Sequence, residues 1–122
     1  MKRQKKKSSI TFNFTGSVAV VSGGGRGIGR AVCVKFLAAG AQVVCLDIDE
    51  SFARGLSRKI FFQKVDVTKT EECKRAIEET VRRFGGVDVL VNSAVIQPPS
   101  SFTPAHLFPE ELWNKMVAVN VS

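Results

Sequence analysis

Residues 17–32 read SVAVVSGGGRGIGRAV, an apolar run followed by a glycine-rich turn and the beginning of a helical pattern. The run 17–22 predicts a buried strand, and the apolar residues between Gly27 and Ala39 recur with the three-and-four spacing of a helix, which Gly40 ends. Glycine lets a backbone turn tightly and come close to a pyrophosphate, while the helix N-terminus offers free N–H groups. This stretch therefore predicts a phosphate-binding turn.

Apolar runs alternate with helical patterns along the rest of the chain. The helix expected over 68–84 opens with a capping-box pattern at Thr68 and Glu71 and closes at Gly85–Gly86. Further strands are expected at 42–47, 60–67 and 87–92, and further helices near 50–57 and from about 109 onward. Strands that alternate with helices form a parallel sheet covered by helices on both faces. The fold class is therefore α/β, a partial Rossmann-type doubly wound parallel sheet of about four strands with flanking helices.

Positive charge is concentrated at the start of the chain. The net charge of the chain is +7, and five of its eighteen basic residues lie in the first seven positions. Residues 8–122 hold the other thirteen basic residues and all eleven acidic ones. We expect residues 1–11 to be a basic, disordered leader and residues 12–122 to form one domain. Such a leader could bind nucleic acid or another anionic surface, and a solvated tail is the simpler interpretation. Nothing behind it resembles a nucleic-acid-binding motif, so a nucleic-acid partner is not expected.

The apolar runs are too short to cross a bilayer, and none follows the basic leader as a secretory signal would require. We therefore expect no membrane partner and a cytoplasmic protein, with organelle targeting left open by the leader.

The cysteines and the histidine do not form a metal-binding pattern. Cys33, Cys45 and Cys73 are odd in number and widely spaced, so we expect reduced thiols in or near the core. His106 has no second ligand at metal spacing, and no metal is expected.

An acidic residue ends the second predicted strand. Asp47 lies eighteen residues after Gly29. A carboxylate at this place accepts hydrogen bonds from the adenosine ribose hydroxyls of NAD and repels the 2′-phosphate of NADP. The sequence therefore predicts NAD as the cofactor, preferred over NADP because of Asp47.

Taken together, these motifs resemble the short-chain dehydrogenase/reductase family. SVAVVSGGGRGIGRAV is similar to the opening of that family, with Ser22 where the family usually has threonine. VVCLDID, at 43–49, is similar to its second strand with the NAD-type acid, and VDVT, at 65–68, places Asp66 and Val67 where the family contacts adenine.

The resemblance continues to the end of the chain and covers roughly residues 12–122. VDVLVNSA, at 87–94, is similar to the family's Asn-Asn-Ala-Gly segment, and ELWNKMVAVNVS, at 111–122, resembles the helix that carries its active-site asparagine, here Asn120. Residues 12–122 would then be the N-terminal part of a Rossmann dinucleotide-binding domain. The cofactor-binding residues that the resemblance implies are Ser22, Gly23, Gly25, Arg26, Gly27, Ile28, Gly29, Asp47, Asp66, Val67, Asn92, Ser93 and Ala94.

Two departures from the family pattern limit the expected activity. Val95 stands where the family usually has glycine beside the cofactor. The family's catalytic serine and Tyr-x-x-x-Lys motif are missing, and the chain contains no tyrosine. In the family that tyrosine is the general acid/base, and the lysine lowers its pKa. Asn120 would therefore keep only a proton-relay position.

The resemblance thus implies an oxidoreductase that transfers hydride between NAD and a small alcohol or carbonyl substrate in a full-length form. The chain itself is expected to be truncated before the catalytic half and inactive. The alternative is a non-catalytic dinucleotide-binding or regulatory remnant, which could pair with a full-length relative.

Overall fold

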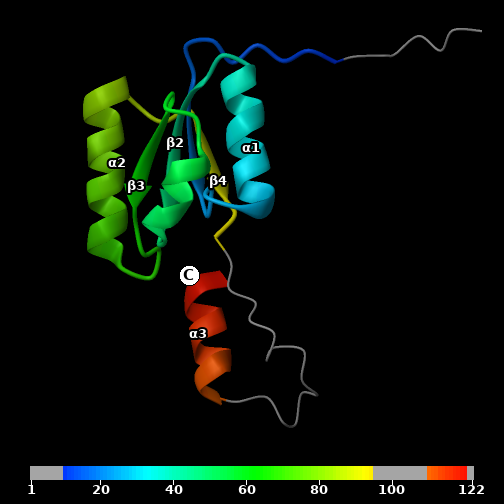
Figure 1. Cartoon of the computed structure of the whole chain (residues 1–122). Helices are drawn as coiled ribbons and strands as arrows, with labels where there is room; N and C mark the ends of the chain where they lie inside the picture. Colours follow the sequence, from blue (N-terminus) through cyan, green and yellow to red (C-terminus); the bar gives the residue numbers. More distant parts are fainter. Residues whose placement is uncertain (1–9, 95–109, 121–122) are drawn as a thin grey trace, which may run out of the picture.

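A computed structural model describes residues 10–94 and 110–120, apart from the side chains of Leu112, Val119 and Asn120. Its centre is a parallel sheet in the order β3-β2-β1-β4 (Figure 1). The strands are β1 (Val18–Ser22), β2 (Gln42–Asp47), β3 (Ile60–Lys64) and β4 (Val89–Asn92). Residues 1–9 of the leader expected at 1–11, and the substitution at Val95, lie outside the described residues.

Helices cover both faces of this sheet. Figure 1 shows α1 (Gly27–Ala38) on one face and α2 (Thr70–Phe84) on the other. A 3₁₀ helix, η1 (Glu50–Gly55), joins β2 to β3, and α3 (Glu110–Asn120) forms the last described segment. The doubly wound layout predicted from the sequence is confirmed. Among the described residues, no helix combines the length and the apolar content that a membrane span requires.

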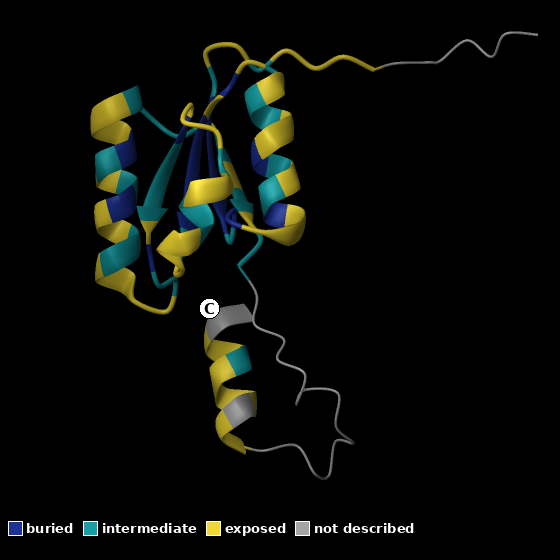
Figure 2. Cartoon of the chain, in the orientation of Figure 1, coloured by how far each residue is buried: buried dark blue, intermediate teal, exposed yellow. Residues whose placement is uncertain are grey.

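The core consists of two apolar clusters separated by the sheet. All of β1 is buried because it lies between β2 and β4, as the dark strands in Figure 2 show. Successive side chains of a strand point to opposite faces, so one continuous apolar run supplies both clusters. Val21 packs toward α1 with Cys33 and Cys45, and Val20 packs toward α2 with Val44.

The end of α1 follows the sequence closely. Gly40 has a φ of +95°, its N–H donates to the Leu37 carbonyl at 3.0 Å, and the Ala41 N–H donates to the Phe36 carbonyl at 3.1 Å. These two bonds form a Schellman motif, which needs a left-handed residue and therefore favours glycine. The predicted stop at Gly40 is confirmed.

The predicted start of α2 is wrong. The helix begins at Thr70, and its N-cap, Lys69, makes no side-chain cap hydrogen bond, so there is no Thr68–Glu71 capping box. Thr68 instead donates to Asp66 from its N–H, at 3.0 Å, and from its hydroxyl, at 2.6 Å. The carboxylate of Glu72 accepts from the Asp66 N–H at 3.2 Å. The Thr68 N–H and hydroxyl, which the capping box would have used, thus belong to a local turn at Asp66.

β3, β4 and η1 are each two or three residues shorter than expected. β3 ends at Lys64 rather than 67, because the chain leaves the sheet toward the Asp66 turn. β4 begins at Val89 rather than 87, since the Asp88 carboxylate accepts from the Val18 N–H at 2.8 Å just before it. The helix expected near 50–57 is η1, a single 3₁₀ segment.

The three cysteines are free thiols, as predicted. Cys33 and Cys45 are buried, and Cys73 is half-buried.

Candidate functional site

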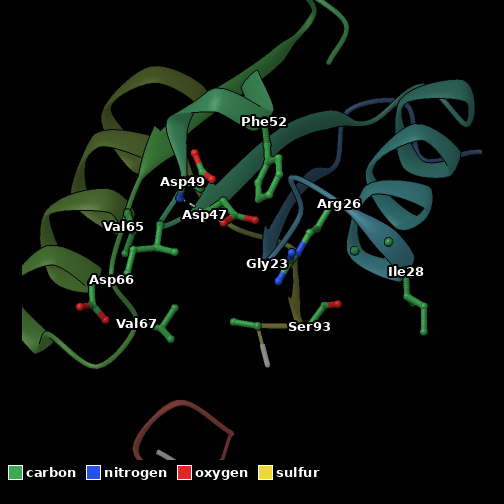
Figure 3. A pocket seen from close by; sticks show the side chains of 14 residues that line it. Gly23, Arg26, Ile28, Asp47, Asp49, Phe52, Val65, Asp66, Val67 and Ser93 are labelled. Atoms are coloured by element: carbon green, nitrogen blue, oxygen red, sulfur yellow. Dashed lines mark hydrogen bonds between the residues drawn. The ribbon is translucent and has the colours of Figure 1, made fainter. Parts of the chain in front are cut away.

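A cavity of about 530 Å³ opens at the carboxyl ends of the strands. β1 lies between β2 on one side and β4 on the other, so the connections diverge here, and ligands of open α/β sheets bind at such a point. The volume suits a small-molecule site. The lining residues, several of which Figure 3 labels, are Gly23, Arg26, Gly27, Ile28, Gly29, Asp47, Ile48, Asp49, Phe52, Val65, Asp66, Val67, Ser93 and Ala94.

The glycine turn between β1 and α1 forms the floor of this cavity. Gly23 has a φ of +66°, and a Cβ there would come within 2.7 Å of the Ala94 backbone. A Cβ on Gly29 would come within 2.1 Å of the Gly23 carbonyl oxygen. No larger side chain fits at either place without moving backbone, so the close approach of helix and strand depends on both glycines.

The N-terminus of α1 faces the cavity through this turn. Arg26, the N-cap residue, has an extended backbone and makes no side-chain cap hydrogen bond. The first N–H groups of a helix have no intrahelical partners and carry a partial positive charge. The lining residues Gly27 and Gly29 belong to this first turn, so the arrangement offers a binding place for an anion.

Ser22 supports the site from behind. Its hydroxyl is buried and accepts from the N–H groups of Ser93, at 3.2 Å, and Ala94, at 3.4 Å. These bonds fix the segment after β4 against the end of β1. Ser22 is not one of the lining residues.

Asp47 lies opposite the turn, at the end of β2. One carboxylate oxygen accepts from the Gly25 N–H at 3.0 Å. The other accepts from the Asp49 N–H at 3.3 Å, as Figure 3 shows. Gly25 is buried, and a Cβ there would come within 2.8 Å of the Asp47 carboxylate and within 2.7 Å of the Phe52 side chain. The predicted acid therefore touches the predicted turn directly.

Two further carboxylates line the cavity. Hydrogen bonds from Ser51, with a smaller contribution from the charge of Arg26, lower the pKa of Asp49. Hydrogen bonds from the hydroxyl and N–H of Thr68 lower the pKa of Asp66. Both groups are therefore ionised at neutral pH, and this side of the cavity can accept hydrogen bonds from hydroxyl or amino groups.

Arg26 is the one cationic side chain among the lining residues of the described chain. Its guanidinium carbon lies 5.4 Å from the centroid of the Phe52 ring. This distance is within the range of a cation–π contact.

Most of the residues expected from the sequence meet at this cavity. Ser22 and Gly25 stand behind the lining, Asn92 is exposed at the end of β4, and the side chain of Asn120 lies outside the described part. Sequence reasoning missed Ile48, Asp49, Phe52 and Val65. The position of Ile48 and Asp49 directly after Asp47 could have indicated them, whereas no pattern marked Phe52.

Comparison with known proteins supports the resemblance seen in the sequence. The sequence profile of the short chain dehydrogenases matches residues 17–122. The chain is 43% identical over 89 residues to the L-fucose dehydrogenase of Bos taurus, covering 70% of this chain and 33% of that protein. It is 38% identical over 116 residues to an uncharacterized oxidoreductase of Thermotoga maritima, covering 88% and 43%. The chain thus spans less than half the length of these relatives.

Solved structures show the same likeness. The NADH complex of the 3-ketoacyl-(acyl-carrier-protein) reductase of Brucella melitensis matches with a TM-score of 0.79 and 30% identity, covering 89% of this chain and 46% of that one. The ligand-free aldohexose dehydrogenase of Thermoplasma acidophilum matches with a TM-score of 0.77 and 27% identity, covering 88% and 39%. The sheet order, the glycine turn and the sequence match agree, and the chain belongs to the short-chain dehydrogenase/reductase family.

Proposed function

We propose that the chain binds NAD at this cavity and forms the cofactor half of an oxidoreductase that transfers hydride between NAD and an alcohol or carbonyl compound. One observation carries the proposal: the open N-terminus of α1 and the carboxylate of Asp47 line the same cavity, on either side of the glycine turn. A dinucleotide has an anionic pyrophosphate and a ribose with two hydroxyls, so it needs a donor side and an acceptor side together.

The residues present fit such a cofactor. A Cβ on Gly27 would project into open space, with nothing within 4 Å, and Gly23, Gly27, Gly29 and Arg26 would hold the pyrophosphate. Asp47 would receive the adenosine ribose hydroxyls.

The remaining assignments also follow the family positions. Asp66 and Val67 would contact adenine, and Ser93 and Ala94 would border the nicotinamide side. Asn92 stands next to these two at the exposed end of β4.

The charges at the adenosine side favour NAD over NADP in this proposal. Asp47 and Asp49 both line the cavity, and the 2′-phosphate of NADP would bring further negative charge beside them. Neighbouring like charges repel, and the free-energy cost of this repulsion rises where water is excluded. The NADH in the related Brucella melitensis structure is consistent with this choice.

Catalysis is the part that these 122 residues do not supply on their own in this proposal. The family's general acid/base is a tyrosine, and the chain has none. The chain's own residues would bind and orient the cofactor, with Asn120 in the relay position. Hydride transfer would then need further polypeptide.

The cytoplasmic location expected from the sequence stays a prediction.

A titration of the chain with NADH, followed by NADH fluorescence, tests the proposal. We expect saturable binding that NAD displaces and that NADPH matches only at higher concentration, without oxidation of the NADH by added carbonyl compounds. A chain that is folded by circular dichroism yet binds neither dinucleotide would contradict the proposal.

A non-catalytic regulatory remnant would bind NADH in the same way, so a second measurement separates the two candidates. The intact mass of the polypeptide in its source cells, captured with an antibody to residues 60–84, supplies it. A mass of roughly twice the 13.3 kDa of this chain would favour the enzyme, and a mass equal to it would favour the remnant.

A further inference from the structure

The residues that line the cavity carry more negative than positive charge. Its lining residues include three aspartates, Asp47, Asp49 and Asp66, but a single cationic residue, Arg26. A guanidinium beside carboxylates normally forms a charge-assisted, often bidentate, pair with one of them. In the described part of the chain, Arg26 forms an ion pair with neither Asp47 nor Asp49. Its charge still reaches Asp49, where it contributes to the lowered pKa of that carboxyl.

The guanidinium is held instead by an aromatic ring. The Arg26 guanidinium carbon lies 5.4 Å from the centroid of Phe52, and Figure 3 shows the two side chains adjacent at the rim of the cavity. The ring faces Gly25 as well, where a Cβ would come within 2.8 Å of the ring atom Cδ2. Phe52 thus contacts both the turn and the cation that follows it.

The segment that carries Phe52 is anchored at several points. Asp49 accepts from the Ser51 N–H at 2.9 Å and caps η1. The guanidinium of Arg30, on α1, donates to the Gly55 carbonyl, and Glu50 forms an ion pair with Lys64 at 3.9 Å. These contacts fix the backbone segment that carries the Phe52 ring.

We propose that Phe52 is a positioning residue, which holds Arg26 away from Asp47 and Asp49. The Arg26 cation then stays available to an anionic ligand, and the two carboxylates stay available to the hydroxyl groups of a ligand. The inference rests on the proposed function, since it assigns Phe52 a part in binding the adenosine diphosphate portion of the cofactor. Without the aromatic face, Arg26 would pair with the carboxylates and occupy the ribose side.

Substitutions that separate the ring's electrons from its bulk test this role. Phe52→Leu keeps an apolar side chain against Gly25 but removes the aromatic face, whereas Phe52→Tyr keeps both. The probe is ADP-ribose, measured by titration calorimetry with the full chain. We expect Phe52→Leu to weaken binding about two- to fivefold, the equivalent of an exposed cation–π contact, and Phe52→Tyr to bind like the original.

A matched control exists on β3. The Arg83 guanidinium carbon lies 4.0 Å from the centroid of Phe61, away from the cavity. Phe61→Leu removes an equivalent cation–π contact, and we expect it to leave ADP-ribose affinity unchanged.

A double-mutant cycle decides whether Phe52 acts through Arg26. In the background of Arg26→Met, which keeps a long side chain without charge, Phe52→Leu should have no further effect on affinity. An equal loss in both backgrounds would show that Phe52 acts by packing or by direct contact with the ligand, and would overturn the proposal.

A measurement without ligand separates this inference from the proposed function. The protons on Cδ of Arg26 should show an upfield ring-current shift in the NMR spectrum, lost in Phe52→Leu and kept in Phe52→Tyr. Absence of that shift in a chain that binds ADP-ribose would overturn the role of Phe52 alone. A shift in a chain that does not bind ADP-ribose would overturn the proposed function, and with it the role of Phe52 in binding.

Discussion

The carboxylate of Asp47 accepts a hydrogen bond from the backbone N–H of Gly25 at 3.0 Å. The acid assigned to the ribose therefore also braces the turn assigned to the pyrophosphate. The two roles draw on the same oxygen atoms, since the second oxygen accepts from the Asp49 N–H. Substitution of Asp47 should consequently change cofactor choice and stability together, unless the replacement keeps an acceptor for Gly25.

Asp47→Asn and Asp47→Ala should separate these roles. Both remove the charge, so both should narrow the difference between NADH and NADPH affinity. Only Asp47→Ala leaves the Gly25 N–H without its partner, at a cost of about 1 kcal/mol in the free energy of unfolding. Urea unfolding of both variants measures this difference. Equal stability of the two would show that the bond to Gly25 contributes nothing.

Gly29→Ala should abolish dinucleotide binding. Its Cβ would lie 2.1 Å from the Gly23 carbonyl oxygen, and relief of that overlap must move the turn away from α1. We expect a loss of about 1–3 kcal/mol in stability together with the loss of NADH binding. Gly86→Ala is the control, because a Cβ there meets nothing within 4 Å and its φ is not in the left-handed region. Unchanged NADH binding in Gly29→Ala would contradict the placement of the pyrophosphate at the turn.

Acid should destabilise the chain through Glu79 on α2. Hydrogen bonds from Arg82 and then Arg83 lower the pKa of Glu79 to about 2 from an ordinary value of 4.5. A carboxyl with a lowered pKa in the folded state stabilises it above the unfolded pKa, and that contribution disappears as pH falls through the folded value. The contribution should therefore be present above about pH 4.5 and be lost toward pH 2.

Glu79→Gln tests this expectation by thermal melts between pH 7 and pH 2. The variant should melt below the original at pH 7 and with it at pH 2. Glu78→Gln, which changes an exposed neighbour on the same helix, should leave the pH profile as it is. Parallel profiles for Glu79→Gln and the original would rule out this contribution.

The three cysteines should differ in reactivity. The hydrogen bond with Cys33, followed by burial, raises the pKa of Cys45, and both thiols have no exposed surface. The raised pKa disfavours the reactive thiolate of Cys45, and burial shields the sulfur atoms of both residues from reagents, so neither should react before the fold opens. A disulfide reagent at pH 8 should thus modify half-buried Cys73 first and the other two only in denaturant. Cys73→Ser should remove the fast phase, and fast reaction of all three thiols would contradict this order.

The parts of the fold that the sequence predicted well are those with a local cause. The strands around Val20 and Val44 follow from continuous apolar runs, and the end of α1 follows from Gly40. The predicted start of α2 is wrong because Thr68 has two competing partners, and in the structure it pairs with Asp66 rather than with the helix. Local preferences of this kind are decided by small energy differences, so a pattern alone does not resolve them.

The site divides in the same way. The glycine turn and Asp47 could be expected from their spacing, because backbone freedom and the end of a buried strand are properties of short segments. The proximity of Phe52 to Arg26 could not be expected, since it depends on η1 being anchored to α1 through Arg30 and Gly55, which are 25 positions apart.

The sequence by itself determined the parallel sheet, the turn and the family, because each depends on the order of residues within a strand, a turn or a helix. Only the tertiary structure decided that Asp47 holds Gly25 and that Phe52 lies against Arg26. These contacts join residues from different elements, and their geometry exists only after the sheet has brought the ends of β1 and β2 together. Hydrophobic periodicity is encoded locally, whereas the pairing of polar and aromatic side chains across a cavity is a product of packing.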